Sequence, residues 1–257
     1  MSESERTRPQ TDAPAGRAAS PAREPGARGR RFDAAVRAYL ERYPQATVVA
    51  LGEGLDTGDT GFWRLDNGRL TWLTVVVPEA AAVRRMLLPD GPRRRTVACA
   101  AGGHGWLDAV REPQRGVIVT APGVLMRLSP AAVRALLAAC AERFPGGALV
   151  FDALPRLTAA LARRAAAAPG GGRRPAPVRW GLDRGDLPRV AGTHPGIAAV
   201  REVAPVPAPG RAGRPAAWVL PSWLGQRAPV LRALTPLVCE VRFAGARSPR
   251  RASSAVS

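Results

Sequence analysis

Short apolar runs alternate along this chain with segments whose apolar residues recur at helical spacing. The runs have the length and composition of strands that are buried on both faces, and they cover residues 47–51, 73–77, 96–100, 117–121 and 148–151. Strand–helix alternation of this kind predicts an α/β fold with a doubly wound, mostly parallel sheet. Ligands of such sheets bind beyond the carboxyl ends of the strands.

Proline and serine mark the ends of the predicted helices. Pro44 ends the first helix, and Pro78 suits the first turn of the second. Ser129 is a natural N-cap for the third, with Pro130 at the first helical position. The apolar residues that define these helices are Phe32, Ala35, Val36, Tyr39, Leu40 and Tyr43; then Val83, Met86 and Leu87; then Val133, Leu136, Leu137 and Cys140.

The two ends of the chain differ in composition from its middle. Residues 1–28 are polar, rich in proline, glycine, alanine and arginine, and without periodicity. Such a segment buries too little apolar surface to offset its ordering entropy, so we predict that it is disordered. We predict the same for residues 248–257. Residues 29–247 then form one domain, which is an ordinary size for a single core.

The formal net charge is +18, and all 38 basic residues are arginine. The arginines are spread along the sequence, whereas nucleic-acid modules concentrate charge on one face and add a recognisable motif. We therefore do not expect a nucleic-acid binder. The three cysteines are far apart and in apolar surroundings, which indicates free thiols in a reducing cytoplasm rather than a metal site. No apolar run has the length of a membrane span or of a signal peptide, so we expect neither.

Residues 47–57, Thr-Val-Val-Ala-Leu-Gly-Glu-Gly-Leu-Asp-Thr, form a strand that ends in a glycine turn. Alone, Gly-x-Gly after a strand is a weak signal, but other motifs accompany it. In order they are residues 62–68 (Phe-Trp-Arg-Leu-Asp-Asn-Gly), 77–79 (Val-Pro-Glu), 88–92 (Leu-Pro-Asp-Gly-Pro) and 143–152 (Arg-Phe-Pro-Gly-Gly-Ala-Leu-Val-Phe-Asp). Over roughly residues 28–243 the chain resembles the leucine carboxyl methyltransferase-like family, which includes bacterial O-methyltransferases of polyketide tailoring.

The resemblance implies a Rossmann-like class I methyltransferase fold with S-adenosylmethionine as methyl donor. Arg28 and Arg30 match arginines of the family that help to hold the donor's carboxylate, a contact suited to a guanidinium; a solvated helix start is the alternative. The turn Gly52-Glu53-Gly54 would let backbone amides approach the methionine end, unless it is a plain strand-end turn. Asp56 would receive the donor's ammonium or cap the next helix.

Three positions depart from the family pattern. Val76 stands where the family has an aspartate that accepts the ribose hydroxyls. Gly103 stands where an acidic residue faces the adenine. Pro122 replaces a glutamine or glutamate after the fourth strand. Residues 58–61 also lengthen the first loop by about three residues, and Glu79 or Asp59 are the candidates to replace the lost acceptor.

Two hypotheses follow from the matches and the departures. The first is an S-adenosylmethionine-dependent O-methyltransferase that methylates a carboxylate or hydroxyl of a small molecule in secondary metabolism. His104 is then the candidate general base for a hydroxyl acceptor, although a histidine of a surface loop is the simpler interpretation; His194 has the same two interpretations. The alternative is a catalytically inactive methyltransferase-fold protein with a binding or regulatory role. The sequence leaves the acceptor and the oligomeric state open.

Overall fold

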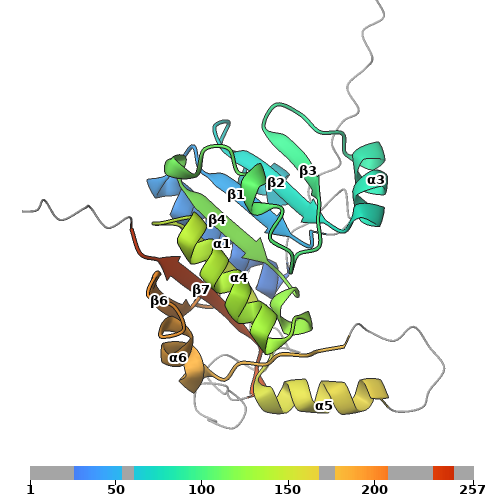
Figure 1. Ribbon diagram of the computed structural model, residues 1–257, viewed down its shortest axis with the longest axis vertical. Coiled ribbons are helices and arrows are strands. Elements are labelled where there is room, and N and C mark those ends of the chain that lie inside the picture. Colours follow the sequence, from blue (N-terminus) through green and yellow to red (C-terminus); the bar gives the residue numbers. More distant parts are fainter. Residues whose placement is uncertain (1–25, 54–60, 168–176, 208–233, 246–257) are drawn as a thin grey trace, which may run out of the picture.

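The computed structural model describes residues 26–53, 61–167, 177–207 and 234–245 (Figure 1). Its seven strands form one sheet in the order β3-β2-β1-β4-β5-β7-β6. They are β1 Thr47–Leu51, β2 Thr71–Val76, β3 Arg94–Ala98, β4 Val117–Ala121, β5 Ala148–Ala153, β6 Ile197–Glu202 and β7 Leu237–Phe243. Strands β1 to β5 pair in parallel, and β7 runs antiparallel to both β5 and β6. The predicted doubly wound, mostly parallel sheet is confirmed.

Burial explains which strands lie at the centre. Every residue of β1, β4 and β5 is buried, because helices cover both faces of a doubly wound sheet. The outermost strand β6 instead has one buried residue, Ile197, and its other residues are exposed or partly buried; β3 at the other edge also has one buried residue. The predicted runs at 47–51 and 117–121 coincide with β1 and β4.

The helices are α1 Ala27–Arg42, α2 Gly61–Leu65, α3 Pro78–Leu87, α4 Pro130–Arg143, α5 Arg156–Ala167 and α6 Leu187–Ala191, and the long helices α1 and α4 cover the two faces of the sheet (Figure 1). In Figure 1, α4 crosses the face of the sheet toward the viewer and α1 lies behind it. The apolar side of α1 packs with Val48, Trp72 and Ile118, whereas α4 packs with Val49, Leu73 and Val119. These residues alternate along β1, β2 and β4, as the period of a strand requires.

The helix signals of the sequence have mixed outcomes. The Ser129 side chain accepts a hydrogen bond from the Ala132 amide at 3.2 Å, which confirms the N-cap of α4. Helix α1 begins at Ala27, so the last two residues of the stretch that we predicted to be disordered are helical, and Arg28 is tied to β5 by an ion pair. Tyr43 lies one residue beyond α1 and is 37% exposed.

Helix α3 buries a different side from the one that its apolar residues indicate. Met86 is 83% exposed, and Val83 and Leu87 are also exposed, whereas Ala81 and Arg84 are buried. The helix predicted from Pro78 is therefore confirmed, but the apolar residues that define it do not form its buried side. The physical reason is a partly buried carboxylate, Glu53, that pairs with the buried guanidinium of Arg84.

The described cysteines are free, and burial raises the pKa values of the Cys140 and Cys239 thiols to about 12. Among the described residues, no three or more histidine, cysteine or acidic side chains are grouped so that they could hold a metal ion. Within the same ranges, the helices are too short or too polar to cross a membrane.

Candidate functional site

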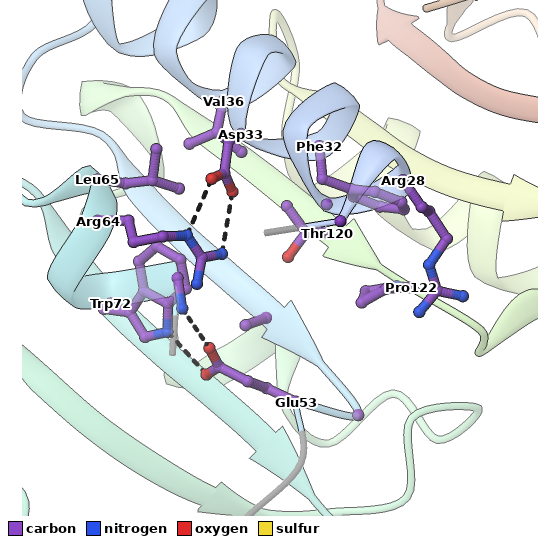
Figure 2. Close-up of a pocket in the computed structure, with 15 residues that line it drawn as sticks. Arg28, Phe32, Asp33, Val36, Glu53, Arg64, Leu65, Trp72, Thr120 and Pro122 are labelled. Carbon is purple, nitrogen blue, oxygen red and sulfur yellow. Dashed lines mark hydrogen bonds and ion pairs between the residues drawn. The ribbon is translucent and has the colours of Figure 1, made fainter. Parts of the chain in front are cut away.

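A cavity of about 450 Å³ lies at the carboxyl ends of β1 and β4, beside the start of α1 (Figure 2). Helix α1 and the residue before it contribute Gly26, Arg28, Gly29, Phe32, Asp33 and Val36. The sheet and its turns contribute Ala50, Gly52, Glu53, Trp72, Thr120 and Pro122, and α2 adds Gly61, Arg64 and Leu65. The cavity therefore occupies the position at which doubly wound sheets bind ligands.

Gly52 makes the turn that follows β1. Its φ of +67° lies in the left-handed region that favours glycine. A Cβ at this position would lie 2.8 Å from Val124 Cγ2, so a side chain does not fit. The Gly52 amide donates to the Val75 carbonyl at 2.8 Å. Gly52 thus contributes space to the cavity, and its amide is not free for a ligand as the sequence led us to expect.

The Glu53 side chain is held by hydrogen bonds inside the protein. Its Oε1 accepts from the Gly61 amide at 3.0 Å, and its Oε2 accepts from Trp72 Nε1 at 3.1 Å and from Thr74 Oγ1 at 2.8 Å (Figure 2). Arg84 Nη2 also donates to Oε2 at 3.0 Å. The carboxylate therefore connects the turn after β1 with β2, α2 and α3, and these hydrogen bonds hold the glycine turn in place.

Arg84 is the buried partner of this carboxylate. Its side chain is 2% exposed, and it also donates to Thr74 Oγ1 at 3.2 Å. Burial lowers the pKa of the Arg84 guanidinium, and the Glu53 charge opposes that shift. An ion this far from water requires such partners, because an unpaired buried charge is strongly unfavourable.

A second ion pair connects the two helices at the cavity. Arg64 of α2 meets Asp33 of α1 through two contacts, Nε to Oδ2 at 2.9 Å and Nη2 to Oδ1 at 3.2 Å (Figure 2). Both side chains are at most 14% exposed. Two-point pairing fixes the plane of the guanidinium as well as its position. The motif at residues 62–68 thereby anchors the start of α1.

The third ion pair lies at the other end of the cavity. Arg28 Nη1 donates to Asp152 Oδ2 at 2.9 Å, and Asp152 Oδ1 accepts from the Gly123 amide. Asp152 is 3% exposed, whereas the Arg28 side chain is 58% exposed. Arg28 therefore presents a charged group to the cavity from a fixed anchor.

The remaining predicted positions divide into two groups. Pro122 lines the cavity with Arg28, Gly52 and Glu53. Among the described residues, four other predicted positions do not line the cavity: Arg30, Val76, Gly103 and His104. Arg30 donates to the Val206 carbonyl at 3.3 Å, and the Gly103 amide donates to the Ala100 carbonyl. Val76 is 6% exposed, and His104 is exposed.

The predicted site residues Gly54 and Asp56 lie outside the described residues. So does Asp59, one of the two candidates to replace the lost ribose acceptor. Glu79, the other substitute acceptor, is exposed in the first turn of α3. His194 precedes the edge strand β6, does not line the cavity, and accepts a hydrogen bond at Nδ1 from the Gly196 amide at 3.0 Å.

Sequence reasoning missed the contributions of Asp33, Arg64, Thr120 and Asp152. Arg64 and Asp152 stand in motifs that carry the family resemblance, and Asp33 follows Arg28 and Arg30, but spacing along the chain does not reveal which acid meets which arginine. Thr120 could have been predicted from the sequence. It is the single polar residue of β4, next to the carboxyl end of an otherwise apolar strand.

Comparisons with known proteins agree with the fold. A methyltransferase of Thermobifida fusca, so described from its crystal structure, superposes with a TM-score of 0.58 at 19% identity, over 84% of this chain and 80% of that one. A DUF574 family protein of Streptomyces avermitilis gives 0.57 at 14% identity, over 84% and 82%. The class I methyltransferase fold that the sequence predicted is therefore confirmed.

The match found by sequence covers less of the chain than the structural matches do. No family model matches the chain. The chain is 30% identical over 128 residues to the tetracenomycin polyketide synthesis O-methyltransferase TcmP of Streptomyces glaucescens, and the match covers 49% of this chain and 46% of that protein. The chain thus spans about half the length of the curated relative that it matches. This similarity agrees with the resemblance to the leucine carboxyl methyltransferase-like family that the ordered motifs carry.

Proposed function

We propose that this protein is an S-adenosylmethionine-dependent O-methyltransferase that acts on a carboxylate or hydroxyl of a small molecule. The observation that carries the proposal is the cavity beside the Gly52 turn, lined by the exposed guanidinium of Arg28, in a chain whose motifs resemble this family. A place in secondary metabolism rests on the similarity to a polyketide O-methyltransferase. A cytoplasmic location rests on the free thiols.

The methionine half of the donor fits the residues present. Arg28 offers a partly solvated guanidinium for the donor's carboxylate. Gly52 leaves room where any side chain would meet Val124. Asp33 and Glu53 are both engaged with arginines, so the negative charges at the cavity are compensated.

The ribose half fits less well. Val76 is an apolar, buried residue at the end of β2, and it cannot accept a hydrogen bond from a ribose hydroxyl through its side chain. A lost partner of this kind costs about 1–3 kcal/mol. Since 1.4 kcal/mol is about tenfold in affinity, we expect weaker donor binding than an aspartate at this position would give.

When bound, S-adenosylmethionine supplies a methyl group that is already activated for displacement. The residues of the chain then have to orient the acceptor and exclude water. No histidine is present among the described residues that line the cavity, and His104 is exposed elsewhere. A carboxylate acceptor needs no general base, whereas a hydroxyl acceptor does. This difference favours the carboxylate.

Methyl transfer tests the proposal directly. The protein is incubated with methyl-labelled donor and a panel of aromatic and aliphatic carboxylic acids and phenols. We expect label in a product that alkali hydrolyses, as it does a methyl ester but not a methyl ether. Gly52→Val should abolish transfer. Gly68→Val is the matched control, because Gly68 also has a positive φ, +77°, but open space around it.

The second candidate function is a catalytically inactive binding protein. It is favoured by Val76 and Gly103, which stand where the family has acidic residues that contact the donor. That alternative predicts no transfer to any acceptor and no difference between Gly52→Val and Gly68→Val. Equal transfer by both variants would contradict the assignment of the cavity as the donor site.

A further inference from the structure

Asp152 is a buried carboxylate at the carboxyl end of β5 that joins three elements. Its two oxygens accept from the Gly123 amide, in the turn after β4, and from Arg28 Nη1, in the first turn of α1. Gly123 has a φ of +70°, and a Cβ there would approach Arg28 Nη1 to 4.0 Å. The turn, the strand and the helix therefore meet at this one side chain.

The exposure of the two partners is very unequal. The Asp152 side chain is 3% exposed and that of Arg28 is 58% exposed. A guanidinium has five N–H donors in a planar fork, and the described bond to Asp152 uses one of its three nitrogens. Figure 2 shows the Arg28 side chain leaving α1 and lying beside Pro122, at the end of the cavity away from Glu53. One side of the ion pair is an internal anchor, and the other borders the cavity.

We propose that Asp152 is a positioning residue for ligand recognition: it holds Arg28 so that its guanidinium receives the carboxylate of an amino-acid-bearing ligand. Without an anchor, an arginine in the first turn of a helix samples many rotamers, and binding must then order it. With the anchor, that ordering is complete before the ligand arrives. The inference rests on the proposed function, under which the ligand is the methyl donor.

Two ligands separate this role from a general effect on the fold. S-adenosylhomocysteine carries the amino-acid carboxylate, and 5′-methylthioadenosine shares its adenosine and thioether but lacks the amino-acid end. In calorimetric titrations of the full chain, Asp152→Asn should weaken S-adenosylhomocysteine by about tenfold, or about 1.4 kcal/mol. Binding of 5′-methylthioadenosine should be unchanged, because Arg28 does not contact it.

A second variant tests whether Asp152 acts through Arg28. Arg28→Met should weaken S-adenosylhomocysteine at least as much as Asp152→Asn and leave 5′-methylthioadenosine unaffected. Adding Asp152→Asn to Arg28→Met should cause no further loss, because coupled residues are not additive. Thermal unfolding of each variant shows whether it is folded, and Arg28→Met keeps the test open if Asp152→Asn is not.

Four results would overturn the inference. Equal weakening of both ligands by Asp152→Asn would show a general structural role, and so would a further loss in the double variant. Unchanged binding of S-adenosylhomocysteine to Asp152→Asn, with tight binding to the wild type, would remove this inference and leave the proposed function standing. Wild-type protein that binds neither ligand would overturn both.

Discussion

Glu53 illustrates how a single residue can belong to a site without facing its ligand. The residue lies in the glycine turn, yet its carboxylate accepts hydrogen bonds from Gly61, Trp72, Thr74 and Arg84. Its role in the structure is to fix the turn and to neutralise a guanidinium that is 2% exposed. Removing Glu53 leaves the Arg84 charge buried without its acid, and removing Arg84 leaves the partly buried Glu53 charge without its base.

A double-mutant cycle measures this coupling. Arg84→Met and Glu53→Gln should each lower the free energy of unfolding by about 3 kcal/mol, because each leaves a buried polar group without its partner. The double variant should lose much less than the sum, since it removes both charges. Urea unfolding monitored by tryptophan fluorescence gives the values. Additive losses would mean that the two residues stabilise the fold independently.

The burial of Arg84 could not be predicted from the sequence. The apolar residues Val83, Met86 and Leu87 indicated the inward side of α3, and all three are exposed. The inward side is instead chosen by a carboxylate more than thirty residues earlier, and hydrophobic periodicity contains no information about such a partner. The same limit applies to Asp33 with Arg64 and to Asp152 with Arg28, which also pair across long separations.

At the scale of elements, local signals were the most reliable. The Ser129-Pro130 start of α4 was predicted and is confirmed, because an N-cap depends on neighbours within three residues. Strands β1 and β4 were predicted with their bounds, because they are apolar and covered on both faces.

The cap gives an element-scale prediction. Ser129→Ala should lower the free energy of unfolding by about 1 kcal/mol, since the Ala132 amide loses its acceptor. Ser129→Asp should retain most of the stability, because its carboxylate can accept the same bond and lies at the positive end of the helix dipole. Urea unfolding compares the three proteins. An aspartate variant no more stable than the alanine variant would contradict the cap's contribution.

Strands β6 and β7 were not predicted. In β6 only Ile197 is buried, so an edge strand of this kind lacks a continuous apolar run. In β7, Glu240 and Arg242 interrupt the apolar residues, and Glu240 is nevertheless buried. Arg201 Nε donates to Glu240 at 2.7 Å and Arg242 Nε donates to it at 2.9 Å, so two arginines compensate this buried charge.

At the scale of the whole molecule, arginine pairing accounts for the buried acids. Asp33, Asp152, Asp186 and Glu240 are buried and each meets at least one arginine. The formal charge of +18 thus includes arginines that hold the fold together as well as those that face solvent. A high arginine content is therefore no sufficient sign of a nucleic-acid partner.

Buried thiols and a buried phenol predict how stability depends on alkaline pH. Burial raises the pKa values of Cys140 and Cys239 from 9.0 to about 12, and that of Tyr39 from 10.0 to about 12. The unfolded chain loses these protons at lower pH than the folded one, so stability falls as pH rises from about 9 to 12. Urea unfolding under reducing conditions measures the slope. Cys140→Ala should flatten it, and an unchanged slope in that variant would contradict the assignment.

The central claim is that the cavity beside Gly52 binds the methyl donor. Calorimetric titration of S-adenosylmethionine and S-adenosylhomocysteine into the full chain tests it most directly. We predict dissociation constants in the micromolar range. Such values would mean that the contact of Arg28 with the donor's carboxylate compensates for the ribose contact that Val76 cannot make. No binding up to millimolar concentrations of either ligand would contradict the account, and it would mean that the chain retains a methyltransferase fold without its cofactor.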